Sequence, residues 1–155
     1  MLFRSLNYYT RSTVSGIGDG VRANSPRNDL DWEIYPQGLV DCARQLYALL
    51  PRPIWVTENG TCDNSDRFRC RYLYEHLAAL SGSELPFERY YHWCFVDNFE
   101  WVEGNSARFG LVKLGENMER ELKRSGRFYA EIIRQGGVTE DMYLSYVAGQ
   151  EYDVR

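Results

Sequence analysis

The chain contains 155 residues, of which 44% are hydrophobic and 26% charged, and its formal net charge is −4 at pH 7. Acidic and basic residues are interspersed, which argues against nucleic acid or an anionic membrane as a partner. No apolar run approaches the length of a membrane span. The four cysteines lack C-x-x-C spacing and nearby paired histidines, so we predict neither a metal site nor a cofactor. No signal peptide is recognisable at the start, and we therefore expect reduced thiols and a cytoplasmic location.

The first part of the chain predicts two short strands that flank a helix. Residues 2–10 are expected to form a strand, and residues 11–31 a long polar loop. A helix begins at Pro36, because apolar side chains then recur at helical spacing until the Pro-Arg-Pro segment at 51–53 stops it. The second strand ends at Glu58, where an Asn-Gly pair indicates a turn.

The remainder predicts two further helices and one strand. Helices are expected over residues 66–81 and 119–135, and a strand with both faces covered over residues 90–96. Four side chains of the last helix are expected to face inward: Leu122, Tyr129, Ile132 and Ile133. The tail from 136 to 155 is polar and lacks a period, so we interpret it as a mobile extension. The alternation of strands and helices predicts an α/β fold with a parallel sheet.

The segment PIWVTENG at 53–60 contains the first candidate catalytic residue. It is an apolar strand that ends on Glu58 and a turn. A carboxylate at the C-terminal end of a buried parallel strand is well placed to act as a nucleophile or general base. The alternative is a strand-end glutamate that only caps a loop.

The segment WCFVDNFEW at 93–101 places a second carboxylate, Glu100, among aromatic side chains. Aromatic rings match the apolar faces of sugars, and the indole N–H can reach a hydroxyl group. The aromatic share of 15% suits a carbohydrate site. Aromatic packing in the core is the alternative and accounts for most of these rings.

Together these segments resemble the C-terminal part of family 1 glycoside hydrolases, the retaining β-glucosidases and their relatives. The family has a strand that ends in T-E-N-G and a later W-S-L-x-D-N-F-E-W segment. The matching segments here occur in the family's order: NYYT at 7–10, WEIYPQGL at 32–39, VTENG at 56–60, YLYEHL at 72–77, WCFVDNFEW at 93–101 and RFGLV at 108–112.

The resemblance implies that residues 1–135 are the C-terminal segment of a TIM (β/α)8 barrel and that residues 136–155 are an extension. A complete barrel needs roughly 250 residues, so this chain supplies about three βα units, the sixth to the eighth. The missing units imply a possible partner: an N-terminal half-barrel, or a second copy of the chain, that covers the open edges of the sheet.

The resemblance also implies a role for each candidate site residue. Glu58 matches the catalytic nucleophile, and Tyr9 matches the tyrosine that donates a hydrogen bond to it. Glu100 matches the glutamate that accepts hydrogen bonds from two hydroxyls of an unphosphorylated gluco- or galacto-like sugar. The remaining substrate-binding candidates are Asn7, Trp93, Trp101 and Phe109.

The family's general acid/base lies in a T-x-N-E-P segment, and nothing in this sequence resembles it. Four other glutamates are interpreted as surface acids: Glu33, Glu84, Glu88 and Glu103. The sequence therefore predicts a β-glucosidase-type segment that binds a β-glycoside but is inactive alone. Two alternatives stay open: a non-catalytic module that binds sugar or protein, and an inactive truncated fragment.

Overall fold

The computed structural model describes residues 3–155, and its centre is a three-stranded parallel sheet with the order β1-β5-β6. The strands are β1 (Arg4–Tyr8), β5 (Ile54–Asn59) and β6 (Phe87–His92). Between and after them come α1 (Pro36–Leu49), α2 (Arg69–Ser81) and α3 (Arg124–Gln135). Three consecutive βα units thus form one sheet, as the alternation of patterns predicts. Residue 2, where the first strand was expected to begin, lies outside the described residues.

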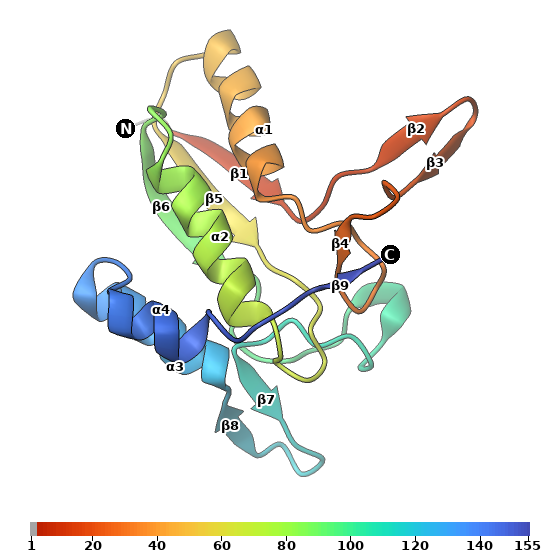
Figure 1. The fold of residues 1–155 in the computed structure, drawn as a ribbon, viewed down its shortest axis with the longest axis vertical. Helices are drawn as coiled ribbons and strands as arrows, with labels where there is room; N and C mark the ends of the chain where they lie inside the picture. The colour runs from red at the N-terminus through yellow and green to blue at the C-terminus, as the bar shows by residue number, and fades with distance from the viewer. Residues whose placement is uncertain (1–2) are drawn as a thin grey trace.

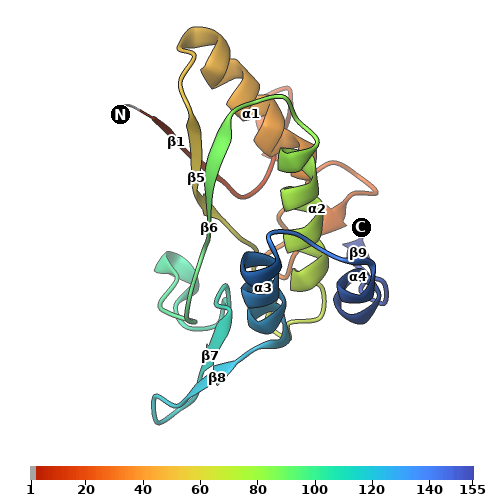
Figure 2. The same cartoon turned by 90° about the vertical axis from the view of Figure 1, so that its left-hand side faces the viewer.

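The helices cover only one face of this sheet. Figures 1 and 2 show α1 and α2 along the same side of the strands. Leu39 and Val40 of α1 and Leu80 of α2 pack there against Tyr8 and Val56. On the opposite face Phe3 stacks on Trp55, and no element of the described chain covers that face. Tyr91 of β6 is 48% exposed, so the prediction that both faces of this strand are covered is wrong for the isolated chain.

Smaller elements extend from this central unit. A hairpin of β2 (Thr13–Ser15) and β3 (Gly18–Gly20) projects away from it, followed by the short strand β4 (Pro26–Arg27) (Figure 1). A second hairpin pairs β7 (Val112–Leu114) with β8 (Arg120–Leu122), and η1 (Trp101–Glu103) is one 3₁₀ turn. Among residues 3–155 no helix combines the length and the apolar character needed to cross a bilayer.

Helix α2 begins at Arg69, three residues later than the sequence pattern predicts. The side chain of Asp63 accepts hydrogen bonds from the backbone N–H groups of residues 67–69. These N–H groups have no partner within a helix, and a carboxylate at the positive end of the helix dipole satisfies them. The buried side chain of Arg69 then donates to the backbone carbonyl oxygens of Asp63 and Arg108 at 2.8 and 2.7 Å.

Helix α3 begins at Arg124, five residues later than predicted, because residues 120–122 pair with residues 112–114 as a hairpin. Leu122 is therefore on a strand and 41% exposed, and Ile133 of α3 is 68% exposed. The prediction that these two side chains face inward is wrong. Tyr129 and Ile132, by contrast, pack against the core around Phe128, as expected.

The C-terminal tail is packed, so the interpretation of residues 136–155 as a mobile extension is wrong. Residues Glu140–Tyr146 form α4, whose N-cap Thr139 accepts a hydrogen bond from the Met142 N–H. Met142 and Val147 are buried beside Cys70. Residues Asp153–Val154 form β9, which pairs with β4. Apolar side chains are few here, but contacts with distant residues hold the tail.

Glu33 corrects another prediction, because it is 3% exposed and is not a surface acid. Its carboxylate accepts two hydrogen bonds from the guanidinium of Arg11, at 2.6 and 3.0 Å. The hydrogen bond raises the pKa of Arg11. A paired and hydrogen-bonded carboxylate can be buried, whereas a single one is costly to bury.

Candidate active site

Glu58 and Tyr9 meet where neighbouring parallel strands end. Glu58 is the fifth residue of β5, and its partner in the register is Asn7 of β1. Tyr9 directly follows β1, so both side chains reach the same edge of the sheet. The Tyr9 hydroxyl donates a hydrogen bond of 2.5 Å to Oε2 of Glu58. Active-site residues of parallel α/β folds gather at this edge.

A pocket of about 240 Å³ opens beside this pair. Six of the seven predicted site residues line it, together with Trp32. The six are Tyr9, Glu58, Trp93, Glu100, Trp101 and Phe109. The pocket therefore combines two carboxylates, a phenol and four further aromatic side chains.

The seventh predicted residue, Asn7, does not line this pocket. Its side chain is exposed, and its Oδ1 accepts a hydrogen bond of 2.7 Å from the hydroxyl of Thr57. Asn7 lies within β1, whereas Tyr9 follows the end of this strand. Only Tyr9 therefore lines the pocket.

Trp32 is the lining residue that sequence reasoning missed. Its ring centroid lies 6.4 Å from Tyr9 and 5.9 Å from Phe109, so the three aromatic rings form one wall. Trp32 belongs to the long connection between β1 and α1 and is the first residue of the WEIYPQGL segment. The WEIYPQGL segment was the sequence feature that could have indicated Trp32. Only the fold shows which side chain of this segment reaches the pocket.

The position of Trp93 depends on the glycine that follows β5. A Cβ atom on Gly60 would lie 1.7 Å from the carbonyl oxygen of Trp93, a separation that no side chain tolerates. The Trp93 N–H donates to the carbonyl oxygen of Asn59 at 2.9 Å, which continues the pairing of β5 and β6 for one residue. The Asn-Gly pair thus allows the backbone at Trp93 to approach the strand end that carries Glu58.

Glu100 and Trp101 form the outer part of the pocket. The Glu100 N–H donates to the carbonyl oxygen of Gly104 at 2.7 Å, and η1 completes this small loop. Trp101 lines the pocket although its side chain is 82% exposed, whereas Phe109 is 2% exposed. One side of the pocket is therefore open to solvent in the isolated chain.

The phenol and the thiol near this pocket are neutral. Burial raises the pKa of Tyr9, and its hydrogen bond to the Glu58 carboxylate raises it further. Burial also raises the pKa of Cys94 to about 11. Tyr9 therefore keeps its proton at neutral pH and donates a hydrogen bond to Glu58. Such a site can hold a sugar ring between aromatic faces and present one carboxylate to it.

The part of the chain that the structure describes contains no candidate metal-binding site. Within residues 3–155 no group of three or more His, Cys, Asp and Glu side chains is arranged to hold an ion. All four cysteines are free, and Cys62, Cys70 and Cys94 are buried.

The parallel βα units define a segment of an α/β barrel, and the carboxylate-aromatic pocket lies at the ends of their strands. Residues 4–138 match the model of the family described as Glycosyl hydrolase family 1. The chain belongs to this family, and its fold is a fragment of the family's TIM barrel.

Relatives and solved structures agree with this assignment. The chain is 35% identical to a β-galactosidase of Saccharolobus solfataricus, over 88% of this chain and 32% of the relative. It is 30% identical to a 1,4-β-D-glucan glucohydrolase of Thermotoga neapolitana, over 89% of this chain and 36% of the relative. The β-glycosidase from Pyrococcus horikoshii superposes with a TM-score of 0.85 at 29% identity, over 93% of this chain and 37% of that one. This chain thus spans about a third of the length of these relatives.

Proposed function

We propose that this chain is the C-terminal part of a retaining β-glycosidase and carries its nucleophile and its sugar-binding subsite. One observation supports the proposal most strongly. The Tyr9–Glu58 hydrogen bond lies at a pocket whose other wall holds Glu100, Trp93 and Trp101. A retaining glycosidase needs a carboxylate that attacks the anomeric carbon, together with groups that hold the sugar in position.

In this proposal Glu58 attacks the anomeric carbon and forms a glycosyl-enzyme ester, while the leaving group departs. The Tyr9 phenol holds the attacking carboxylate in one orientation. Glu100 accepts hydrogen bonds from two hydroxyls of the sugar, and Trp93 contributes an aromatic face. The two oxygens of the Glu100 carboxylate match two adjacent hydroxyls of a sugar. The negative charge of this carboxylate would repel the phosphate of a phosphorylated sugar.

The general acid/base is expected outside this chain. Retaining enzymes place two carboxyl groups about 5–5.5 Å apart, one as nucleophile and one as acid/base. The family's T-x-N-E-P segment has no counterpart here. Loss of a general acid/base lowers the rate by roughly 10²- to 10⁴-fold. Full turnover therefore requires the remaining barrel units, either on the same polypeptide or on another.

The proposed substrates are β-glycosides of unphosphorylated gluco- or galacto-type sugars. Relatives of this chain include a β-galactosidase and a 1,4-β-D-glucan glucohydrolase. A β-glucosidase from Thermotoga maritima, at 28% identity and a TM-score of 0.79, has been solved in complex with castanospermine, with 89% of this chain and 36% of that one covered.

The experiment is covalent trapping, measured as the intact mass of the chain after incubation with a 2-fluoro-β-glucoside. A dinitrophenolate leaving group departs without acid assistance, so the reaction tests Glu58 and the sugar pocket independently of the missing acid/base. We expect a mass increase of one 2-fluoroglucosyl group, mapped to Glu58 by peptide sequencing.

Glu58→Gln is the matched control, because it keeps the shape of the side chain and removes the nucleophile. The adduct must be absent in this variant, and castanospermine binding should be retained. A folded wild-type chain that binds castanospermine without forming the adduct would indicate a sugar-binding module. A folded chain that does neither would indicate an inactive fragment.

A further inference from the structure

Strand β5 is irregular at the point where it carries Glu58. In the pairing of β5 with β6, Val56 lies opposite Tyr90. Asn59 lies opposite His92, so three steps along β5 match two steps along β6. The pairing of β5 with β1 also shifts by one residue just before Glu58. Irregularities of this kind re-aim side chains and interrupt the ladder of backbone hydrogen bonds. The ladder alone therefore holds Glu58 less firmly than it holds the start of the strand.

The side chain of Asn59 joins this irregular strand end to three other elements. Asn59 is 0% exposed. Its Nδ2 donates hydrogen bonds to the carbonyl oxygen of Tyr8 in β1 at 2.7 Å and to the hydroxyl of Tyr72 in α2 at 2.8 Å. Its Oδ1 accepts a hydrogen bond of 2.8 Å from the hydroxyl of Tyr90 in β6. Both N–H groups and the oxygen of this buried amide are thus paired, and each partner lies on a different element.

These contacts hold the backbone from which three pocket side chains extend. The carbonyl oxygen of Tyr8 belongs to the peptide group that Tyr8 shares with Tyr9. Asn59 directly follows Glu58, so its side chain links the backbone of Tyr9 to that of Glu58. The backbone carbonyl oxygen of Asn59 accepts a hydrogen bond of 2.9 Å from the Trp93 N–H. Tyr9, Glu58 and Trp93 all line the pocket.

We propose that Asn59 is a positioning residue of this pocket, whose amide sets the geometry of the Tyr9–Glu58 hydrogen bond. Asn59 is buried behind the pocket and does not line it, so it acts through the backbone of its neighbours. A misplacement of about 1 Å at a reacting group can lower a rate about 100-fold. The effect on covalent trapping rests on the proposed function, whereas the effect on the hydrogen bond does not.

The alternative is a purely structural role, in which the amide stabilises the fold without setting this hydrogen bond. Loss of the amide would then lower the free energy of unfolding, because its buried partners would be left unpaired. The molecules that remained folded would keep the Tyr9–Glu58 hydrogen bond. The hydrogen bond itself must therefore be observed in the folded chain.

Two variants weaken the contacts of Asn59. Asn59→Ala removes the amide, and Tyr72→Phe removes one of its partners while it keeps the ring. The measurement is the ¹³C resonance of the tyrosine Cζ atoms in selectively labelled protein, with the Tyr9 signal assigned by its absence in Tyr9→Phe. This signal responds to the hydrogen bond that the phenol donates. We expect it to move towards the position of an unfolded tyrosine in both variants.

Covalent trapping by the 2-fluoro-β-glucoside gives a second readout. At saturating probe, the rate of adduct formation should fall about 10- to 100-fold in Asn59→Ala and about 3- to 10-fold in Tyr72→Phe. The probe concentration that gives half of the maximal rate should stay within about threefold of the wild-type value. This separation is expected because Glu100, which is proposed to bind the sugar hydroxyls, lies outside the contacts of Asn59.

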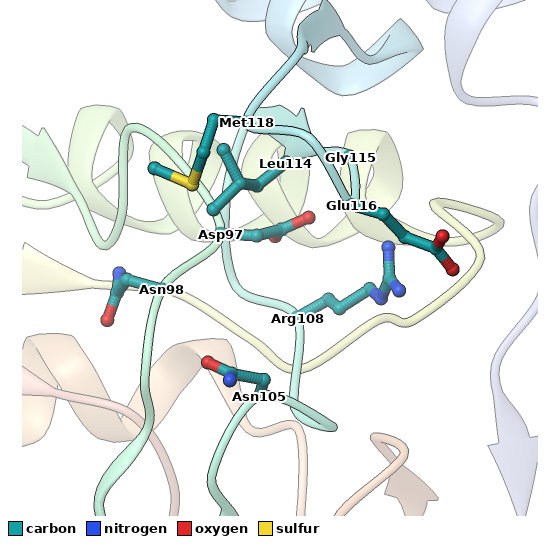
Figure 3. Close-up of a pocket in the computed structure, with 8 residues that line it drawn as sticks. All are labelled: Asp97, Asn98, Asn105, Arg108, Leu114, Gly115, Glu116 and Met118. Carbon is teal, nitrogen blue, oxygen red and sulfur yellow. The ribbon is translucent and has the colours of Figure 1, made fainter.

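Each variant has a matched control. Asn105→Ala removes an amide from an exposed residue that lines a separate pocket of about 460 Å³, shown in Figure 3. Tyr152→Phe removes a hydroxyl from the aromatic cluster that contains Tyr72, where this hydroxyl donates to Glu75 at 2.9 Å. Both controls should leave the Tyr9 signal and the trapping rate unchanged. Thermal unfolding of all four variants measures the effect on stability separately.

The inference is overturned if the Tyr9 signal in folded Asn59→Ala and Tyr72→Phe matches the wild type, or if the controls move it equally. Tyr72→Phe decides alone if Asn59→Ala does not fold. A displaced Tyr9 signal with an unchanged trapping rate would overturn the effect on the reaction. If the wild type forms no adduct at Glu58 but the Tyr9 signal moves in the variants, the proposed function is contradicted and the positioning role of Asn59 is supported.

Discussion

The hydroxyl of Tyr9 lies 2.5 Å from Oε2 of Glu58, although the two residues are 49 positions apart in the sequence. The parallel pairing of β1 with β5 produces this contact, because it brings the ends of both strands to one edge. Burial and the neighbouring carboxylate raise the pKa of Tyr9, so the phenol is a permanent donor near neutral pH.

Tyr9→Phe removes the donor and preserves the aromatic ring. We expect covalent trapping of Glu58 by the 2-fluoro-β-glucoside to slow about 10- to 100-fold, since a hydrogen bond to a charged group contributes about 1.5–3 kcal/mol. The measurement is the rate of adduct formation by intact mass. Tyr8→Phe is the control, because the Tyr8 hydroxyl donates to the carbonyl oxygen of Tyr35 away from the pocket. Equal rates in the wild type and Tyr9→Phe would contradict a positioning role.

Trp32→Ala should weaken sugar binding. This side chain forms a wall of the pocket with Tyr9 and Phe109, and aromatic contacts of this kind contribute about 0.5–1.5 kcal/mol beyond buried area. We expect the affinity for castanospermine, measured by calorimetry, to fall about 10-fold. Trp55→Ala serves as the control because Trp55 stacks with Phe3 on the open face of the sheet. An equal loss in both variants would indicate a general effect on folding.

Acid should destabilise the chain through His76, which is fully buried in α2. Burial lowers its pKa to about 4, whereas an unfolded histidine has a pKa of about 6.5. Between these values the unfolded chain binds more protons than the native one. The free energy of unfolding is therefore highest above pH 6.5 and decreases as the pH falls towards 4. One pKa unit corresponds to about 1.4 kcal/mol.

Urea unfolding at a series of pH values between 7 and 5 measures this effect. The chain has only two histidines, and carboxylates titrate mostly below this range. His76→Gln cannot titrate, so its free energy of unfolding should change less over the interval than that of the wild type. Burial also lowers the pKa of His92, to about 3, so a smaller slope should persist. If the free energy of unfolding changed equally with pH in the wild type and in His76→Gln, the lowered pKa of His76 would be contradicted.

Met142→Ala tests the packing of the C-terminal tail. Met142 of α4 is 7% exposed and lies in the same cluster as Cys70 and Phe128. Truncation of a buried methionine to alanine lowers the free energy of unfolding by about 2–5 kcal/mol. Leu144→Ala changes a neighbour in α4 that is 62% exposed, and its effect should stay within about 0.5 kcal/mol. Similar small effects of both substitutions would mean that α4 does not pack on the core.

The predicted order of strands and helices rested on local patterns and is confirmed where those patterns dominate. Helix α1 starts at Pro36, because proline fits the first turn of a helix, and β5 contains Glu58 and ends one residue later, at Asn59. The starts of α2 and α3 were predicted too early. Asp63 binds the N–H groups ahead of α2, and the β7–β8 hairpin precedes α3. The spacing of apolar residues along a helix does not predict these interactions, because they depend on one particular side chain and on pairing with another strand.

The sequence by itself determined the family, the alternation of strands and helices, and the placement of Glu58 at a strand end. Only the tertiary structure decided that Trp32 joins the pocket, that Asn7 does not, and that Glu33 is buried against Arg11. It also decided that residues 140–154 pack on the chain. Local patterns report the conformation of neighbouring residues, whereas burial and pairing depend on contacts between segments that are far apart in the chain.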